Sequence, residues 1–353
     1  MPDINEIVDI TISVENSALS RQGFNSLLVA GGTSDFKADG AVPFAIGDVK
    51  EYSNMQAVID DDAVLTTGEV YKMASVAFAQ TPAVPKLYIA YATDQATIAA
   101  ADVSLILQNN SDWYGWASSF QTAAEVELID ATLAGAGKAP FYLNVDDLAD
   151  LDAIIYPSSV STVSSLWHTK SASTSGAKYV NVALASRILA QTPGSYTAAY
   201  KTLSNVDVSE YTGAEESKLD ELRINRYVPV QGRNVTYDGK NGPGNVGFLD
   251  TYIGVQYLKA RMAEDVFSTI ASVEKLPFTN DGINMIVNTV KRRLQQSIAD
   301  GFGAPDPAPT VTAPLVTEVN PVDKSNRVLT PVDFVLYEAG AIHKVTIKGR
   351  VIA

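Results

Sequence analysis

The chain has 353 residues, with 26 Lys and Arg against 40 Asp and Glu, so its formal net charge is −14. This acidity argues against a general nucleic-acid binder, because neutralising phosphates requires a basic surface. The absence of cysteine excludes disulfides, thiolate metal sites and cysteine nucleophiles. Apolar residues make up 46%, enough for a sizeable core, and no apolar run reaches the roughly 18 residues of a membrane span. We expect a soluble protein of two or three domains, made in the cytoplasm.

The N-terminal segment alternates apolar and polar residues, which is typical of a strand with one apolar face. It has no hairpin partner next to it in the sequence. The residues of this predicted strand that we expect to pair with another strand are Val8, Asp9, Ile10, Ile12 and Val14.

The next part of the chain alternates helices and strands, which is typical of an α/β layer whose strands are covered on both faces. The apolar spacing predicts strands over residues 26–30, 86–91, 103–107 and 141–145, and helices over 69–80, 122–133, 182–189 and 215–225. The pattern of residues 41–62 predicts strand and loop. We therefore predict a mixed α/β fold.

The segment from Tyr227 to Gly301 has the most regular pattern. Two short strands, 227–230 and 234–237, flank Gly232 and lead to a long helix whose apolar residues recur every three or four positions from Tyr252 to Val273. An i, i+4 pair of Arg261 and Asp265 is expected on its polar side. After Pro277, a second helix capped by Asn280 or Asp281 continues to Ile298.

Residues 303–314 are rich in Pro and Ala and predict an extended linker, and strands follow at 334–337 and 342–352. From these changes in pattern we expect an N-terminal arm at residues 1–20 and an N-terminal and middle α/β region at 21–210. We assign residues 211–302 to a C-terminal core part with two long helices, and residues 303–353 to the linker, the final strands and a C-terminal arm.

No catalytic constellation is found in the sequence. His168 has no Gly-x-Ser-x-Gly elbow or fixed carboxylate to work with, and His343 lies at the root of the last strand, so we expect structural roles for both. The turn Ala30–Ser34 follows a strand but lacks the lysine and third glycine of nucleotide-binding loops. We predict a protein without catalytic residues, cofactor or metal.

The two ends of the chain carry opposite charge on amphipathic strands. In the last strand Val345, Ile347 and Val351 share one face, while Lys344, Lys348 and Arg350 share the other; the first strand is flanked by acidic residues. An unpaired strand is a template for another strand, and opposite charges favour this pairing. The ends can pair within one subunit, or between subunits in a head-to-tail contact that propagates into a polymer.

The order of elements in the last 140 residues resembles that of contractile phage tail sheath proteins, particularly the shorter branch found in myophages and prophages. The resemblance is carried by Leu222–Tyr227, Gly232, Tyr237–Gly239, Gly247–Asp250, the helix to Phe267, Lys275–Thr279 and Gly282, and Asp9–Ser13 also fits. It covers residues 215–353, whereas residues 60–210 belong to a part that varies within such families.

This resemblance implies a structural subunit that polymerises around a tail tube by strand exchange and contracts to drive the tube through the host envelope. It implies contacts with other copies of the chain, the tube protein, and the baseplate and terminator proteins, without direct nucleic-acid contact or membrane insertion. It further implies a virion tail component assembled in the host cytoplasm. A helix of the C-terminal core would touch the tube, with Lys291, Arg292 and Arg293 as candidates. The alternatives are another phage assembly protein, such as a tube or shell subunit, and more remotely an α/β hydrolase.

Overall fold

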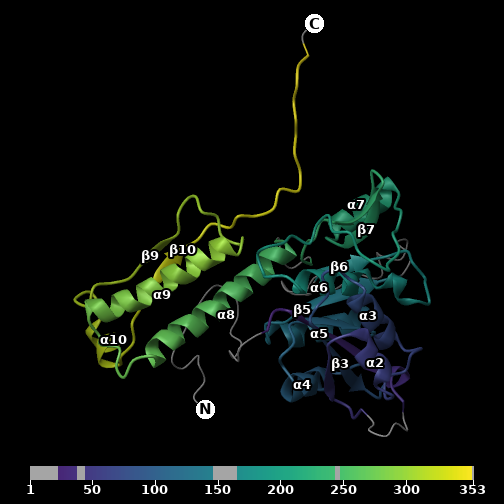
Figure 1. Ribbon diagram of the computed structural model, residues 1–353, viewed down its shortest axis with the longest axis horizontal. Helices are drawn as coiled ribbons and strands as arrows, with labels where there is room; N and C mark the ends of the chain where they lie inside the picture. The colour runs from purple at the N-terminus through teal and green to yellow at the C-terminus, as the bar shows by residue number, and fades with distance from the viewer. Residues whose placement is uncertain (1–22, 38–43, 146–164, 243–246, 352–353) are drawn as a thin grey trace.

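The computed structural model is elongated, with one large mixed sheet and its helices at one end and a pair of long helices at the other (Figure 1). It describes residues 23–37, 44–145, 165–242 and 247–351. The predicted α/β fold is confirmed. Among the described residues, no helix is long and apolar enough to span a membrane.

The eight strands of the sheet lie in the order β2–β3–β1–β4–β5–β6–β7–β8. The six inner strands run parallel, and the edge strands β2 and β8 are antiparallel to their neighbours. The strands are β1 (Ser26–Gly32), β2 (Val49–Tyr52), β3 (Lys86–Thr93), β4 (Gly115–Ser118), β5 (Ala139–Asn144), β6 (Ser165–His168), β7 (Asn225–Val230) and β8 (Arg233–Tyr237). Since β7 and β8 belong to this sheet, the α/β layer continues beyond the boundary expected at residue 210.

Helices cover both faces of the sheet, which explains why its central strands are almost entirely apolar. On one face, α3 (Glu69–Phe78) and α6 (Val180–Leu189) pack on Leu27, Leu87 and Phe141. On the other, α4 (Ala100–Asn109) and α5 (Ala123–Ala134) pack on Leu28, Trp116 and Tyr142. A short helix, α2 (Met55–Asp60), precedes α3, and α7 (Gly213–Glu221) precedes β7.

The strand predicted over residues 103–107 is wrong, because these residues lie in α4. Val103 and Ile106 are buried three positions apart, as on a helix, and Asp102 accepts a hydrogen bond from Ala99 N at 2.8 Å in the first turn. Two further elements, α2, which is capped by Asn54, and the short strand β4, were not predicted from the sequence. Helix α7 ends at Glu221, earlier than predicted, and Asn225 already belongs to β7.

The long helix α8 (Leu249–Ala271) joins the two parts of the molecule, and α9 (Asn280–Ala299) returns alongside it (Figure 1). The first half of α8 packs on the core under α3 and α6, while Leu258, Met262 and Val266 form a separate core with α9. The N-cap of α9 is Thr279, which accepts a hydrogen bond from Gly282 N, and the predicted caps Asn280 and Asp281 lie inside the helix.

The chain after α9 follows the outside of the helix pair. The predicted linker contains a strand, β9 (Thr310–Thr312), which contacts α9 and pairs antiparallel with β10 (Asp333–Val335). Between them lies the short helix α10 (Pro321–Ser325). Phe334 and Leu336 face the core of the helix pair, and this two-stranded ribbon thereby becomes a third layer on α9.

Candidate functional site

The C-terminal residues from Lys344 to Val351 project from the body as an extended segment, which we call the C-terminal arm (Figure 1). No hydrogen bond or ion pair between described residues involves them. The exposed fractions of Val345, Ile347 and Val351 are 70%, 87% and 98%. The strand predicted over residues 342–352 therefore has no partner among the described residues of its own subunit and is not formed there. Strand structure requires a second strand to satisfy its backbone groups.

The chain leading to the arm is attached to the body at two points. Ala304 N donates to the carbonyl of Tyr337 at 2.7 Å, and Ala339 N donates to the carbonyl of Phe302 at 2.8 Å. Thr251 Oγ1 donates to Glu338 Oε1 at 2.6 Å. The second point of attachment is His343, which contacts Thr197 and Tyr200. The sequence around His343 does not indicate Thr197 or Tyr200 as its partners, because both lie more than 140 positions away along the chain.

The ribbon of β9 and β10 lies on the surface of the helix pair and has two outer edges. Neither outer edge is paired with a further strand among the described residues. Val335 and Tyr337 are about half exposed, and Asp333 and Glu338 are exposed beside them. An open strand edge with apolar and acidic side chains matches the apolar and basic faces of the C-terminal arm.

The predicted N-terminal arm strand, with Val8, Asp9, Ile10, Ile12 and Val14, lies outside the described residues. Its pairing with the C-terminal arm stays a prediction.

The three predicted tube-contact residues lie in α9 but differ in their surroundings. Lys291 and Arg292 are exposed. Arg293 is bound within the subunit, since its Nε donates to Asp265 Oδ2 of α8 at 2.7 Å. Of the three candidates, Arg293 therefore already has an acidic partner within its own subunit. Arg261 forms an ion pair with Glu264 at 2.7 Å, and Asp265, which was predicted to pair with Arg261, binds Arg293 instead.

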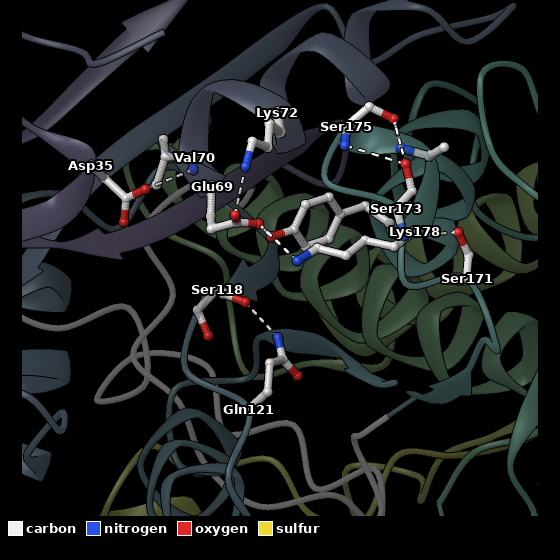
Figure 2. Close-up of polar contacts among 12 residues, drawn as sticks. Asp35, Glu69, Val70, Lys72, Ser118, Gln121, Ser171, Ser173, Ser175 and Lys178 are labelled. Atoms are coloured by element: carbon white, nitrogen blue, oxygen red, sulfur yellow. Dashed lines mark hydrogen bonds and ion pairs between the residues drawn. The ribbon is translucent and has the colours of Figure 1, made fainter. Parts of the chain in front are cut away.

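A cavity of about 760 Å³ lies where strands β1, β3, β4 and β5 end. This edge of a parallel sheet is where many α/β proteins bind ligands. The turn Gly31–Ser34 lies here, but Asp35 accepts a hydrogen bond from Val70 N at 3.1 Å (Figure 2). It also accepts one from Gly32 N at 3.0 Å. This carboxylate occupies the start of α3, where a phosphate would bind.

Several other polar groups in and beside this cavity are also paired within the chain. Glu69 binds Lys72 at 2.7 Å and Lys178 at 3.0 Å and accepts a hydrogen bond from Tyr179 (Figure 2). Burial raises the pKa of Glu69, but these hydrogen bonds outweigh it and lower the pKa to about 2. For Asp35, burial dominates and raises the pKa. Gln121 donates to the carbonyl of Ser118 and accepts from Leu143 N. Contacts within the chain therefore occupy these groups.

The two histidines occupy structural positions. His168 lies buried in β6, with its Nδ1 2.9 Å from the hydroxyl of Tyr211. Among the residues that the structure describes, no group of three or more Asp, Glu or His side chains could hold a metal ion.

Residues 249–305, which comprise α8, α9 and the turn after them, match the sequence model of a protein family described as E217 tail sheath protein gp31-like, C-terminal domain. The predicted resemblance to tail sheath proteins is confirmed. We call this segment the sheath domain. No curated protein sequence gives a significant match.

Solved structures extend the likeness from the sheath domain to the whole chain. A chain of the anti-feeding prophage baseplate aligns with a TM-score of 0.69 at 11% identity, covering 98% of both chains. A chain of an extracellular contractile injection system, described as the PVC sheath complex in the contracted state, aligns with a TM-score of 0.71 at 8% identity, covering 97% of this chain and 96% of that chain. At these identities the likeness establishes the shared fold.

Proposed function

We propose that the chain is a subunit of a contractile tail sheath that polymerises by strand exchange through its arms. The observation that carries this proposal is the C-terminal arm, which has exposed apolar residues and no partner strand among the described residues, attached to a sheath domain. Burying these side chains contributes roughly 1.5–3 kcal/mol for each large apolar residue, and a neighbouring subunit offers the surface for it.

In this proposal the arm adds a strand to the β9–β10 ribbon of a neighbouring copy, together with that neighbour's N-terminal arm. The basic side of the arm then faces exposed Asp333 and Glu338 or the acidic residues of the N-terminal segment. Backbone hydrogen bonds provide affinity, and the alternation of side chains sets the register. Such a contact is head-to-tail and extends into a lattice.

The sheath would act mechanically. Subunits assembled around a tail tube form a metastable extended lattice, and contraction forms larger contacts between subunits while the arms keep neighbours connected. The partners are other copies of the chain, the tube protein, the baseplate and the terminator, and assembly takes place in the host cytoplasm. No chemical step is needed, so we propose that the chain is not an enzyme.

The tube contact is a separate part of the proposal. Lys291 and Arg292 on the outer side of α9 are its candidates, since both are exposed and the sheath domain contains them. Changing both residues to Glu should weaken decoration of the cognate tube without affecting assembly of the sheath alone. Co-sedimentation with tubes at low and high salt measures this. Unchanged decoration would place the contact elsewhere on the subunit.

Deletion of the C-terminal arm tests the main proposal. Removing residues 344–353 should leave a folded subunit that no longer polymerises, because the removed residues contact only a neighbour. A separate deletion of residues 1–14 should have the same effect. Circular dichroism checks the fold, and negative-stain microscopy with sedimentation measures the polymer. Tubules formed by either truncated chain would overturn the strand-exchange hypothesis.

A further inference from the structure

The C-terminal arm leaves the body at His343, which is held from three sides. Thr197 Oγ1 lies 3.0 Å from His343 Nε2, and the Tyr200 hydroxyl donates to the His343 carbonyl at 2.8 Å. The ring of Phe248 meets the imidazole edge-on, at 4.9 Å between centroids and 90° between planes, and the Tyr200 ring does the same at 5.8 Å. We call these four residues the His343 clamp.

The body side of the clamp is fixed independently of the arm. Tyr200 N donates to the carbonyl of Thr236 in β8 at 2.7 Å, and the Tyr200 ring packs edge-on against Tyr237. Tyr200 also has a φ of +58°, a left-handed conformation that costs a non-glycine residue free energy and that concentrates at functional sites. Phe248 is the N-cap residue of α8.

The third side of the clamp, Thr197, also faces Asp250 in the first turn of α8. Burial raises the pKa of Asp250, while a hydrogen bond from Thr197 and the charge of His343 act in the opposite direction. A hydroxyl has only one proton, so when Thr197 donates it to Asp250, His343 Nε2–H is the donor to Thr197.

The clamp follows a stretch of chain that has few attachments to the body. Before it, the last backbone attachment is at Ala339, and residues 340–342 make no hydrogen bond with another described residue. Gly340 and Ala341 instead border a cavity of about 320 Å³. Ile342 before the clamp and Val345 after it are 83% and 70% exposed, whereas His343 itself is only partly exposed. His343 is therefore the last point at which the described chain holds the arm.

We propose that the His343 clamp is a positioning device that fixes where the arm leaves its subunit, so that Lys344 and the residues after it reach a neighbouring copy in one register. The inference rests on the proposed role of the arm in assembly. Without the clamp, four residues from 340 to 343 would be released. At about 3.5 Å per residue, the first pairing residue would then range over about 14 Å. A longer free segment lowers the effective concentration of the arm at the strand with which it pairs. It also allows the two strands to pair in a shifted register.

Trypsin cleavage of the isolated full-length subunit tests the clamp. A protease needs several released residues on both sides of the bond it cuts, so cleavage after Lys344 requires the clamp to open, whereas cleavage after Lys348 does not. In the unmodified chain, cleavage after Lys344 should be at least about tenfold slower than after Lys348. Equal rates would overturn the clamp. Mass spectrometry of the fragments gives both rates from one digestion.

Variants on the body side test the residues themselves without altering the cleaved sequence. Thr197→Val with Tyr200→Phe removes both polar contacts and keeps the Tyr200 ring position filled. This double variant should accelerate cleavage after Lys344 about tenfold and leave the Lys348 rate unchanged. Thr197→Ser, which keeps the hydroxyl, should cleave like the unmodified chain. An unchanged ratio of the two rates in the double variant would overturn the assignment of these contacts.

Assembly of the same variants tests the positioning role. The double variant should polymerise several-fold more slowly at equal thermal stability, and the control variant Thr197→Ser should polymerise at the rate of the unmodified chain. Normal assembly of a double variant with a released arm would overturn the positioning role. Deleting residues 344–353 in the same assay distinguishes failure of the proposed function from failure of the clamp. If this truncated chain still polymerises, the proposed role of the arm in assembly is wrong. The cleavage ratio tests the clamp independently of that result.

Discussion

At the scale of single residues, Lys138 is a charged group placed almost entirely inside the α/β layer. Its exposed fraction is 2%, and its ammonium group donates to the carbonyls of Ser111 and Trp113 and lies 4.8 Å from the centre of the Trp113 ring. Burial lowers the pKa of Lys138 to about 8, although Asp112 acts in the opposite direction. The group therefore loses its proton more readily in the folded chain than in the unfolded chain.

This depressed pKa predicts a pH dependence of stability. Between pH 8 and about 10.5 the unfolded chain binds more protons, so stability should rise with pH in this window by at most about 1.4 kcal/mol per pH unit. We expect the free energy of unfolding of the unmodified chain, relative to Lys138→Met, to increase from pH 8 to pH 10 in urea titrations. Lys86→Met, at an exposed lysine, is the matched control. Parallel pH profiles for Lys138→Met and the unmodified chain would contradict the prediction.

A second residue-scale feature is the ion pair that joins α8 to α9. Arg293 and Asp265 are each mostly buried, with 16% and 24% of their side chains exposed. Asp265→Ala should lower the free energy of unfolding by about 1–3 kcal/mol, since it leaves the Arg293 charge without its partner. Lys291→Ala and Arg292→Ala, one and two positions away but exposed, should change it by less than about 0.5 kcal/mol. Chemical denaturation measures all three, and equal effects would show that the pair is not structural.

At the scale of elements, α8 must pass very close to the turn that follows α9. A Cβ atom at Gly254 would lie 2.3 Å from the ring of Phe302, so only glycine permits this approach. Phe302 is also in contact with Gly194 and thus anchors the end of the helix pair to the α/β layer. Phe302 thus adds a contact between the two parts of the molecule that α8 joins.

The close approach predicts the sign of a substitution that would otherwise be favourable. In an exposed helix interior, Gly→Ala stabilises by about 1 kcal/mol, but overpacking costs about 1–3 kcal/mol. Gly254→Ala should therefore destabilise the chain, and adding Phe302→Leu should recover part of the loss because the ring is removed. Thermal unfolding of both single variants and the double variant forms the cycle. Additive effects would show that the two residues are not coupled.

At the scale of the whole molecule, the feature that matters most is the charge of the arms. Lys344, Lys348 and Arg350 are exposed, and the chain otherwise has an acidic balance. Each exposed pair contributes only about 0.2–1 kcal/mol, but a lattice repeats the contact at every subunit. These charges should therefore influence the rate and register of assembly more than the stability of one subunit.

Reversing charges tests which surfaces meet. Changing Lys344, Lys348 and Arg350 to Glu should slow assembly, and changing Glu6 and Asp9 to Lys in the same chain should restore it. Light scattering follows the rate, and microscopy identifies the product. If the combined variant assembles no better than either single set, the two arms are not electrostatic partners, and the acidic side of the β9–β10 ribbon becomes the surface to test.

Local periodicity in the sequence was sufficient to predict several elements of the fold. The apolar spacing of α8 and α9, the glycine-terminated strand β1 and the hairpin of β7 and β8 all follow from patterns within a few residues, and their order carried the resemblance to sheath proteins. The exposed C-terminal arm was also predictable as an amphipathic extended segment. The short apolar-rich run in α4 was read wrongly because so short a run fits a strand as well as a helix.

Only the tertiary structure decided which of these residues are available to a partner. Arg293 resembles its neighbours in the sequence, yet folding brings Asp265 beside it and leaves Lys291 and Arg292 exposed. His343 has no local feature that distinguishes it, but the fold brings Thr197 and Tyr200 to it from about 145 positions away. The physical reason is that periodicity is a local property, whereas burial and pairing depend on contacts between segments distant in the chain.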